Sequence, residues 1–393
     1  MFRRSLLAGV LAALAVTSVV PSYADHDKGN GKSQDHKHAK GPKKAQPEAD
    51  PCRDPFSTAH EVRLGSVGPF DVRALVALPP RKPQGIVVFD HGYGHTMASW
   101  REHVSETAAR LGVIAVAPNY HRQTGTHGWW VAEGAQDSIA FAQHFERLCD
   151  PKGTNVVYGV SMGGNTSGLV VAAQPKKPDG RTPLFDYWID VEGAVNVTET
   201  YAGAAALAGA NGYAAKAKAD IEEAFGGSPL EVPDVDAERT VVNRTEEIAG
   251  AGLKGVVVVH GAADGLVPYN QSRELQALLR DEGVPVDFWT AVTRRDGTEA
   301  GTTIDGYVHE GAQTGQTSPF AGHASETSKN HVVGLAGFAA LDRLYTKAPF
   351  TCGEHDRGAR RGGGAHAAQR LSRGRCSCTP SAPSCRRTRS RRR

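Results

Sequence analysis

Long hydrophobic runs are almost missing from this chain of 393 residues. Beyond its first residues, no stretch approaches the roughly 20 consecutive apolar residues that a membrane-spanning helix needs. The six cysteines include no C-x-x-C pair, which argues against a zinc site, and no internal repeat is present. The composition of the whole sequence, with 40% hydrophobic and 22% charged residues, fits an ordinary globular protein.

An excess of positive charge is also missing from the body of the chain. The whole sequence carries a net charge of +3, but residues 353–393 contain 12 Arg against Glu354 and Asp356. That segment alone carries +10, so the preceding residues together carry −7. A mildly acidic body gives no indication of a nucleic-acid surface, and we expect no nucleic-acid partner.

The two ends of the chain differ from its middle. Residues 1–24 have the pattern of a secretory signal peptide, with Arg3 and Arg4, an apolar run and a small-x-small site ending at Ala24. Residues 25–50 are polar and rich in Lys and His, which predicts a disordered linker. The Arg-rich segment 353–393 is likewise predicted to be disordered. We therefore expect a secreted protein with no stable membrane span after cleavage.

Export would place the cysteines in an oxidising compartment. Cys52, Cys149 and Cys352 flank or lie within residues 51–352, which we expect to form the folded domain. These three cysteines allow one disulfide bond, and the sequence alone does not pair them.

Strand and helix patterns alternate through this domain. A polar–apolar alternation predicts an opening hairpin, and continuous apolar runs predict strands buried on both faces. Helical spacing separates these strands, so we predict an α/β fold: a mostly parallel central sheet with helices on both faces. The predicted strands are 61–68, 70–79, 85–90, 113–118, 155–160, 187–191, 255–260 and 286–292, and the main helices 98–111, 135–148, 162–173, 273–281 and 331–345.

Two insertions interrupt the alternation. Residues 196–252 are Ala-rich and partly helical, and they are the candidate for a helical cap. Residues 294–322 are rich in Gly and Thr with little apolar content, which predicts a long loop.

The motif G-x-S-x-G occupies residues 159–163, with Ser161 at its centre. A buried strand is predicted to lead directly into it and a helix to lead directly out. That context indicates a sharp turn that exposes the serine hydroxyl above the sheet, in front of a helix N-terminus. We therefore predict that Ser161 is a nucleophile, in preference to a glycine-rich turn that only caps a helix.

A serine needs a base, and the base needs an acid that orients it. Asp264 follows the predicted strand 255–260 and is the favoured acid, with Glu192 and Asp190 as rivals. The base should come from the end of the domain, and we favour His323 just before the last helix. His331 and His309 are alternatives.

Two backbone amides should stabilise an oxyanion, one from Met162 and one from Tyr93 in the glycine-rich loop that follows residues 85–90. His91 in that loop is expected to brace it and not to take part in the reaction. Trp129 and Trp130 are candidates for lining an apolar substrate pocket, although aromatic residues more often belong to the core.

Together, the HG-x-G loop at 91–94, the G-x-S-x-G motif, the segment HGAADGLVP at 260–268 and the late Gly-His pair resemble the α/β-hydrolase superfamily. In detail the chain looks like exported bacterial serine hydrolases of the dienelactone-hydrolase and prolyl-oligopeptidase-like branches. The resemblance covers about residues 61–345. It implies an α/β-hydrolase fold, a triad of Ser161, Asp264 and His323, and no cofactor or metal. The long interval between Asp264 and His323 departs from the family pattern.

This reading predicts a secreted serine hydrolase of the carboxylesterase or lipase type. It would cleave small-molecule or lipid-like carboxylic esters through an acyl-enzyme on Ser161. A serine peptidase of prolyl-oligopeptidase type is the first alternative, although no gating domain precedes Cys52. A non-catalytic binding protein on a hydrolase scaffold is the second, because a fold does not fix a function.

Overall fold

The computed structural model describes residues 50–262, 264–293, 300–304, 307–311, 323–324, 326–327 and 331–346. The predicted signal peptide (1–24), the predicted linker except its last residue, and the Arg-rich tail (353–393) lie outside the described residues. So does Cys352, the third cysteine of the predicted domain.

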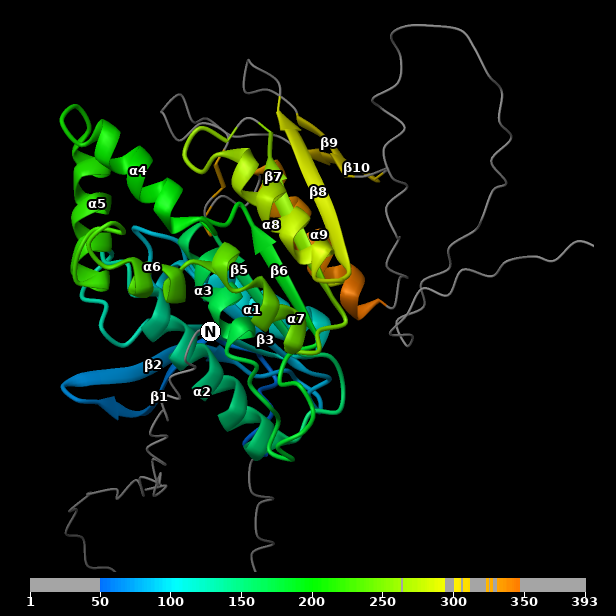
Figure 1. Ribbon diagram of the computed structural model, residues 1–393. Helices are drawn as coiled ribbons and strands as arrows, with labels where there is room; N and C mark the ends of the chain where they lie inside the picture. Colours follow the sequence, from blue (N-terminus) through cyan, green and yellow to red (C-terminus); the bar gives the residue numbers. More distant parts are fainter. Residues whose placement is uncertain are drawn as a thin grey trace, which may run out of the picture. The chain divides into compact units, whose positions relative to one another are not determined.

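Ten strands in the described part of the chain form one sheet, in the order β1-β2-β4-β3-β5-β6-β7-β8-β9-β10 (Figure 1). The pairs from β4 to β8 are all parallel, and the strands at both ends of the order pair antiparallel. The predicted α/β architecture with a mostly parallel sheet is therefore confirmed. The strands are β1 His60–Val67, β2 Phe70–Ala77, β3 Ile86–Asp90, β4 Ile114–Pro118, β5 Val156–Val160, β6 Tyr187–Val191, β7 Gly255–Gly261, β8 Val286–Thr293, β9 Ala300–Ile304 and β10 Tyr307–Gly311.

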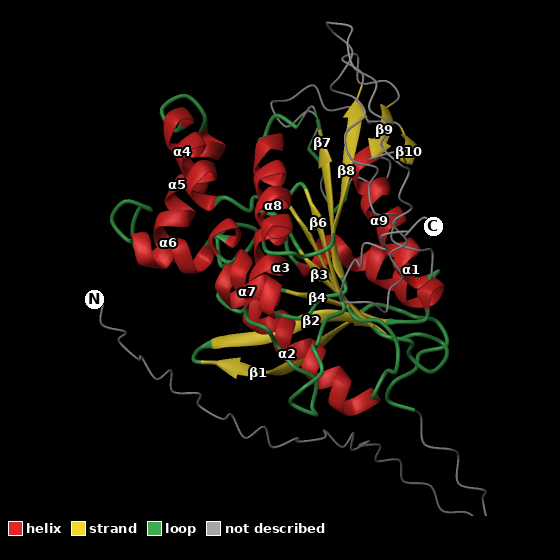
Figure 2. Ribbon diagram, turned by 45° about the vertical axis from the view of Figure 1, so that its right-hand side comes forward, coloured by secondary structure: helices red, strands yellow, loops and turns green. Residues whose placement is uncertain are grey.

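Helices cover both faces of the sheet, and Figure 2 shows them on either side of it. Side chains of α1 and α9 join one buried cluster, and side chains of α2, α3, α7 and α8 join the other. Described helices and 3-10 turns are η1 Met97–Trp100, α1 Arg101–Leu111, α2 Val131–Cys149, α3 Met162–Ala172, α4 Val197–Leu207, α5 Gly212–Phe225, α6 Pro233–Arg239, η2 Val241–Asn243, α7 Thr245–Gly250, α8 Tyr269–Asp281 and α9 Val332–Tyr345.

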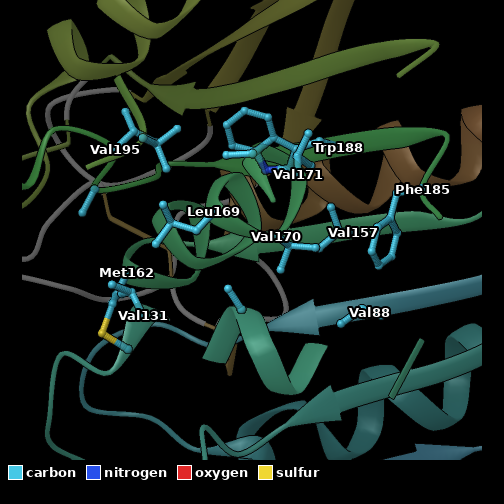
Figure 3. Packing of buried hydrophobic residues seen from close by; sticks show 14 of the residues in the cluster. Val88, Val131, Val157, Met162, Leu169, Val170, Val171, Phe185, Trp188 and Val195 are labelled. Atoms are coloured by element: carbon cyan, nitrogen blue, oxygen red, sulfur yellow. The ribbon is translucent and has the colours of Figure 1, made fainter. Parts of the chain in front are cut away.

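Successive residues of a central strand enter different clusters, because side chains alternate across a sheet. In β3, Val87 belongs to the cluster beneath α1 and α9, whereas Val88 belongs to the cluster beneath α2 and α3. Figure 3 shows Val88 and Val157 of two adjacent strands in the second cluster, with Val170 of α3. Burial on both faces explains why these strands have uninterrupted apolar sequences.

The insertion at 196–252 forms α4, α5, α6, η2 and α7. Two asparagines begin the first two of these helices: Asn196 accepts the Glu199 amide, and Asn211 accepts the amides of Tyr213 and Ala214. The helices α4, α5 and α6 lie together (Figures 1 and 2).

The segment 294–322 differs from the predicted long loop. It contains β9 and β10, which form a hairpin that extends the sheet beyond β8. An apolar sequence pattern indicates that a strand is buried, and it does not reveal backbone pairing. The Gly- and Thr-rich sequence of β9 and β10 lacks this pattern, so the pairing of these strands could not be predicted from it.

A disulfide bond joins Cys52 to Cys149 at the end of α2, across 97 residues of sequence. Among the described helices, none has the length and apolarity to cross a membrane.

Candidate functional site

Ser161 is the single residue between β5 and α3. Its backbone has φ 57° and ψ −123°. These angles match the first central position of a type II′ turn, which glycine dominates because a side chain there is strained. A non-glycine residue in this conformation marks a position where function can depend on strain.

The glycines of the G-x-S-x-G motif are required by close approach. A Cβ on Gly159 would lie 2.0 Å from the Gly163 carbonyl oxygen, and a Cβ on Gly163 would lie 2.1 Å from the Asp90 carbonyl oxygen. Both distances are well below van der Waals contact with backbone atoms that cannot move aside. Only glycine therefore allows α3 to leave β5 at this sharp angle.

Backbone hydrogen bonds hold the strained residue in place. The Ser161 amide donates to the Val191 carbonyl at 3.0 Å. The Ser161 carbonyl accepts the amides of Gly164 at 2.8 Å and Ala194 at 3.0 Å. These bonds connect the turn to the end of β6, so two adjacent strands fix the position of the serine.

An imidazole and a carboxylate meet beyond β7. His323 Nδ1 lies 2.7 Å from Asp264 Oδ2, and the Asp264 side chain is fully buried. Asp264 Oδ1 accepts the backbone amides of Leu266 and Val267, at 2.8 and 3.0 Å. His260 Nε2 approaches the other oxygen at 3.3 Å. The carboxylate is thus held rigidly where it orients His323.

The rival acids take different positions. Glu192 follows β6, and its Oε2 lies 3.6 Å from His323 Nδ1, beyond hydrogen-bonding distance. Its two oxygens instead accept the amides of Gly261 at 3.0 Å and Ala324 at 2.6 Å. Asp190 is completely buried in β6, where it faces Gly193. Of the three candidate acids, Asp264 alone is hydrogen-bonded to His323.

The rival histidines are also separated. His331 is the N-cap of α9, where its Nδ1 accepts the Val333 amide at 3.3 Å. Burial lowers the pKa of His331 to about 4, which keeps it neutral as a helix cap. His309 falls in β10, whose side chains lie outside the described part of the chain.

The loop after β3 borders the serine. A Cβ added to Gly92 would lie 3.2 Å from Ser161 Cβ, so this loop passes close to the nucleophile position. Met162 is the first residue of α3, and its amide is one of the first-turn N–H groups that find no partner within a helix. His91 stacks on Tyr120 at 4.0 Å, and burial lowers its pKa to about 3. It braces the loop, in agreement with the expected structural role.

Glu326 is a site residue that sequence reasoning missed. Its buried side chain accepts the Gly92 amide, and its second oxygen lies 3.5 Å from His95 Nδ1. Its own carbonyl accepts a hydrogen bond from His103 Nε2 at 2.8 Å. The residue therefore links the segment that carries His323 to the loop after β3. An acid three positions after a candidate histidine follows no short-range rule that would have identified it.

A pocket of about 260 Å³ brings these parts together. Ser161 and His323 both line it, beside the loop after β3, Leu266, and Tyr213 of α5. Trp129 and Trp130 are not among its lining residues; both belong to the buried core, and the Trp129 ring lies 5.6 Å from the Tyr93 ring behind the wall.

The strained serine follows β5, the acid follows β7 and the histidine lies beyond β8, all on one sheet. The loop after β3 lies beside them, and the order of serine, acid and histidine along the chain is the one typical of α/β-hydrolases. The chain has an α/β-hydrolase fold.

Comparisons with known proteins found only distant similarities. No protein-family model matches the chain, and no curated protein matches it. Among solved structures, the chain is similar to the hyperthermophilic esterase from Pyrobaculum calidifontis, with 17% identity, a TM-score of 0.49, and coverage of 76% of this chain and 86% of that one. It is also similar to the Pyrococcus horikoshii acylaminoacyl peptidase, with 17% identity, a TM-score of 0.44, and coverage of 60% and 36%. A third neighbour is Porphyromonas gingivalis dipeptidyl peptidase 4, with 13% identity, a TM-score of 0.44, and coverage of 60% and 32%.

The chain thus spans about a third of the length of those two peptidases. Likeness at these scores adds nothing to the strand order and the serine turn, on which the assignment to the α/β-hydrolase fold depends.

Charge in the pocket of this α/β-hydrolase fold is concentrated around His323. Burial acts to lower the pKa of His323, but the neighbouring Asp264 carboxylate raises it to about 9. Burial acts to raise the pKa of Asp264, but the charge of His323 holds it well below its usual range. Burial and the Asp264 charge raise the pKa of Glu192 to about 8. Asp264 therefore makes the largest contribution to the raised pKa of His323, and the charges of Glu192 and Glu326 act in the same direction.

The same three residues form the one group in the described part of the chain whose ligand atoms lie close enough to hold a metal ion, within 4.8 Å of one another. The bond between Asp264 and His323 and the amides that bind Glu192 already use these atoms. In this arrangement, Asp264 orients the His323 imidazole and Glu192 binds backbone amides.

Proposed function

We propose that this protein is a serine hydrolase whose nucleophile is Ser161 and whose base is His323, oriented by Asp264. The observation that supports this most strongly is one pocket lined by both a serine in a strained strand-to-helix turn and an imidazole 2.7 Å from a buried carboxylate. That combination matches the requirement of nucleophilic catalysis for a hydroxyl, a base and an orienting acid.

In the proposed reaction, neutral His323 accepts the Ser161 hydroxyl proton as Oγ attacks the carbonyl carbon of the substrate. The amides of Met162 and Tyr93 stabilise the negative charge on the tetrahedral intermediate. The imidazolium then protonates the leaving group, which departs and leaves an acyl-enzyme. Water, activated by the same imidazole, hydrolyses the acyl-enzyme. Asp264 keeps the imidazole in the orientation that each step needs.

Carboxylic esters are the proposed substrates, and the pocket favours a small acyl group. A space of about 260 Å³ lies below the range of roughly 300–1,000 Å³ that pockets for drug-sized ligands occupy. Val160, Tyr213, Leu266 and Ala324 contribute apolar groups to its lining. Trp129 would then influence the substrate through Tyr93, and neither Trp129 nor Trp130 would contact it directly.

Fluorophosphonate labelling tests the nucleophile. We expect wild-type protein to be labelled and Ser161→Ala to remain unlabelled, with p-nitrophenyl acetate and butyrate hydrolysed faster than long-chain esters. Faster cleavage of aminoacyl anilides than of any ester would favour the peptidase alternative. A folded wild-type protein that is neither labelled nor active would support the non-catalytic binding protein.

We propose further that the protein is secreted, with a signal peptide cleaved after Ala24. The disulfide bond between Cys52 and Cys149 supports this, because such bonds persist in oxidising compartments. N-terminal sequencing of protein from the culture medium tests it. An N-terminus at Asp25 is expected, and intact protein retained in the cytoplasm would contradict the proposal.

A further inference from the structure

The cap helix α5 accepts a hydrogen bond from the loop after β3 through one buried carboxylate. Asp220 is 2% exposed, and its Oδ2 accepts the Tyr93 hydroxyl at 2.5 Å and the Gly128 amide at 3.2 Å. Its Oδ1 forms an ion pair with Lys216, one turn earlier on the same helix. One side chain of the cap therefore binds two separate loops of the hydrolase core.

The ring of Tyr93 is held from several sides. It packs against Tyr213 of α5 edge to face at 5.4 Å, against Trp129 at 5.6 Å and against His127 at 5.5 Å. The side chain thus lies between the cap helix and the core. Tyr93 also lines the pocket beside Ser161.

The hydroxyl of Tyr93 is fixed as a donor. Burial and the neighbouring Asp220 carboxylate raise the pKa of this phenol above its usual range, so it stays protonated. Hydrogen bonds to a charged acceptor are stronger than neutral ones, and loss of the acceptor would leave a buried hydroxyl without a partner. Geometry and charge both favour the contact.

Tyr93 lies in a short turn of the loop after β3, which the His95 amide closes by donating to the Gly92 carbonyl at 3.3 Å. Tyr93 lies between Gly92 and Gly94, and Gly94 has φ 84°, a conformation that glycine adopts readily. Gly92 is held by Glu326 through its amide, whereas the anchor of Tyr93 is its side chain. The hydrogen bond of the Tyr93 side chain therefore adds a second restraint to the turn that sets the direction of the Tyr93 amide.

We propose that Asp220 is a positioning residue, through which cap helix α5 holds the Tyr93 amide in place for the oxyanion. The inference depends on the proposed function, and it makes the cap part of the catalytic step. Loss of one oxyanion donor typically lowers kcat by about 10²–10³-fold. Because a displaced amide keeps part of its effect, we expect roughly a 10-fold or greater loss of kcat in Asp220→Ala and Tyr93→Phe, with KM little changed.

The same cap contains a matched control. The Tyr201 hydroxyl donates to Glu222 Oε1 at 2.6 Å, and Lys218 pairs with the same oxygen at 2.6 Å. This group repeats the tyrosine, carboxylate and lysine of the Asp220 contact, but it joins α4 to α5 within the cap. Tyr201→Phe and Glu222→Ala should therefore lower thermal stability while keeping kcat within about twofold of wild type.

The experiment measures kcat, KM and Tm on p-nitrophenyl acetate for both pairs of variants and for the double variant Tyr93→Phe/Asp220→Ala. The double variant should lose no more kcat than the more severe single variant, because both changes break one contact. Asp220→Asn, which keeps an acceptor for the hydroxyl, should retain more kcat than Asp220→Ala. If Asp220→Ala fails to fold, Tyr93→Phe carries the test, because it removes the donor of the same contact.

Two results would overturn the inference. One is unchanged kcat in folded Tyr93→Phe and folded Asp220→Ala, or in Tyr93→Phe alone if Asp220→Ala does not fold. The other is an equal loss of kcat in the Tyr201 control, which would indicate only general loosening of the cap. An inactive and unlabelled wild type would instead overturn the proposed function, and with it this inference.

Discussion

Replacing Ser161 with glycine should stabilise the protein while it abolishes hydrolysis. The residue has φ 57° and ψ −123°, angles that a Cβ makes unfavourable and that glycine adopts freely. The bonds that enforce this conformation join backbone atoms, from Val191, Gly164 and Ala194. Glycine keeps all of these bonds, so the change removes strain and leaves the turn intact.

The size of the effect follows from two opposing contributions. A side chain in such a sparsely populated conformation costs about 1–3 kcal/mol. Glycine loses more backbone freedom on folding than other residues, which costs roughly 0.5–1 kcal/mol. We therefore expect Ser161→Gly to exceed Ser161→Ala in free energy of unfolding by about 1 kcal/mol. Both variants lack the hydroxyl, so their difference isolates the Cβ.

Urea unfolding of wild-type, Ser161→Ala and Ser161→Gly proteins measures this difference at equal m-values. Ser161→Ala keeps the strain and should remain close to wild type. A glycine variant equal to or less stable than the alanine variant would refute the view that the serine turn stores strain. Turnover near the wild-type rate in either variant would refute the role of the hydroxyl.

Three further predictions concern the surroundings of the serine. Because only neutral His323 accepts a proton, kcat/KM should rise with pH through about 9. Asp264→Asn removes the charge that raises this pKa, so the rise of kcat/KM should move to lower pH while kcat falls. An unmoved pH profile would contradict the pairing of Asp264 with His323. Cys149→Ser opens the bond to Cys52 and should lower the free energy of unfolding by about 3–5 kcal/mol in urea titrations, since a disulfide that closes a loop of this length restricts the unfolded chain strongly; a loss under about 1 kcal/mol would argue against that account. Glu326→Gln keeps an acceptor for the amide of the loop after β3, whereas Glu326→Ala does not, so kcat should fall roughly 10-fold further in the alanine variant, and equal rates would show that the contact does not matter.

The parts of the fold that the sequence predicts well are those where burial leaves a local record. The strands β3, β5, β6 and β7 are covered on both faces, so each appears as a short apolar run near its observed bounds. The strands β9 and β10 leave no such record, and they were missed. Their pairing is a backbone property, which composition rich in Gly and Thr does not reveal.

The residues of the candidate site also differ in whether a local sequence pattern predicts them. Ser161 is predictable because its strand, turn and helix are contiguous, and the glycines beside it are required by contacts within a few residues. The pairing of Asp264 with His323 spans 59 residues and needed knowledge of the sheet order. Glu326 and Asp220 act on the loop after β3 from 234 and 127 residues away, and no spacing rule connects them to it.

The sequence offers three candidates for the acid that orients the histidine, and the folded chain distinguishes them by distance and charge. Asp264 and Glu192 each accept two backbone amides, so hydrogen bonds to the main chain do not distinguish them. What distinguishes them is the imidazole, 2.7 Å from one carboxylate and 3.6 Å from the other. Two carboxylates this close to one another do not both ionise easily in a buried site, so the nearer keeps its charge while the pKa of the farther rises to about 8. The distances assign Asp264 to orient the proposed base and leave Glu192 to hold the backbone at Ala324, and the opposite directions of the two pKa shifts agree with this assignment.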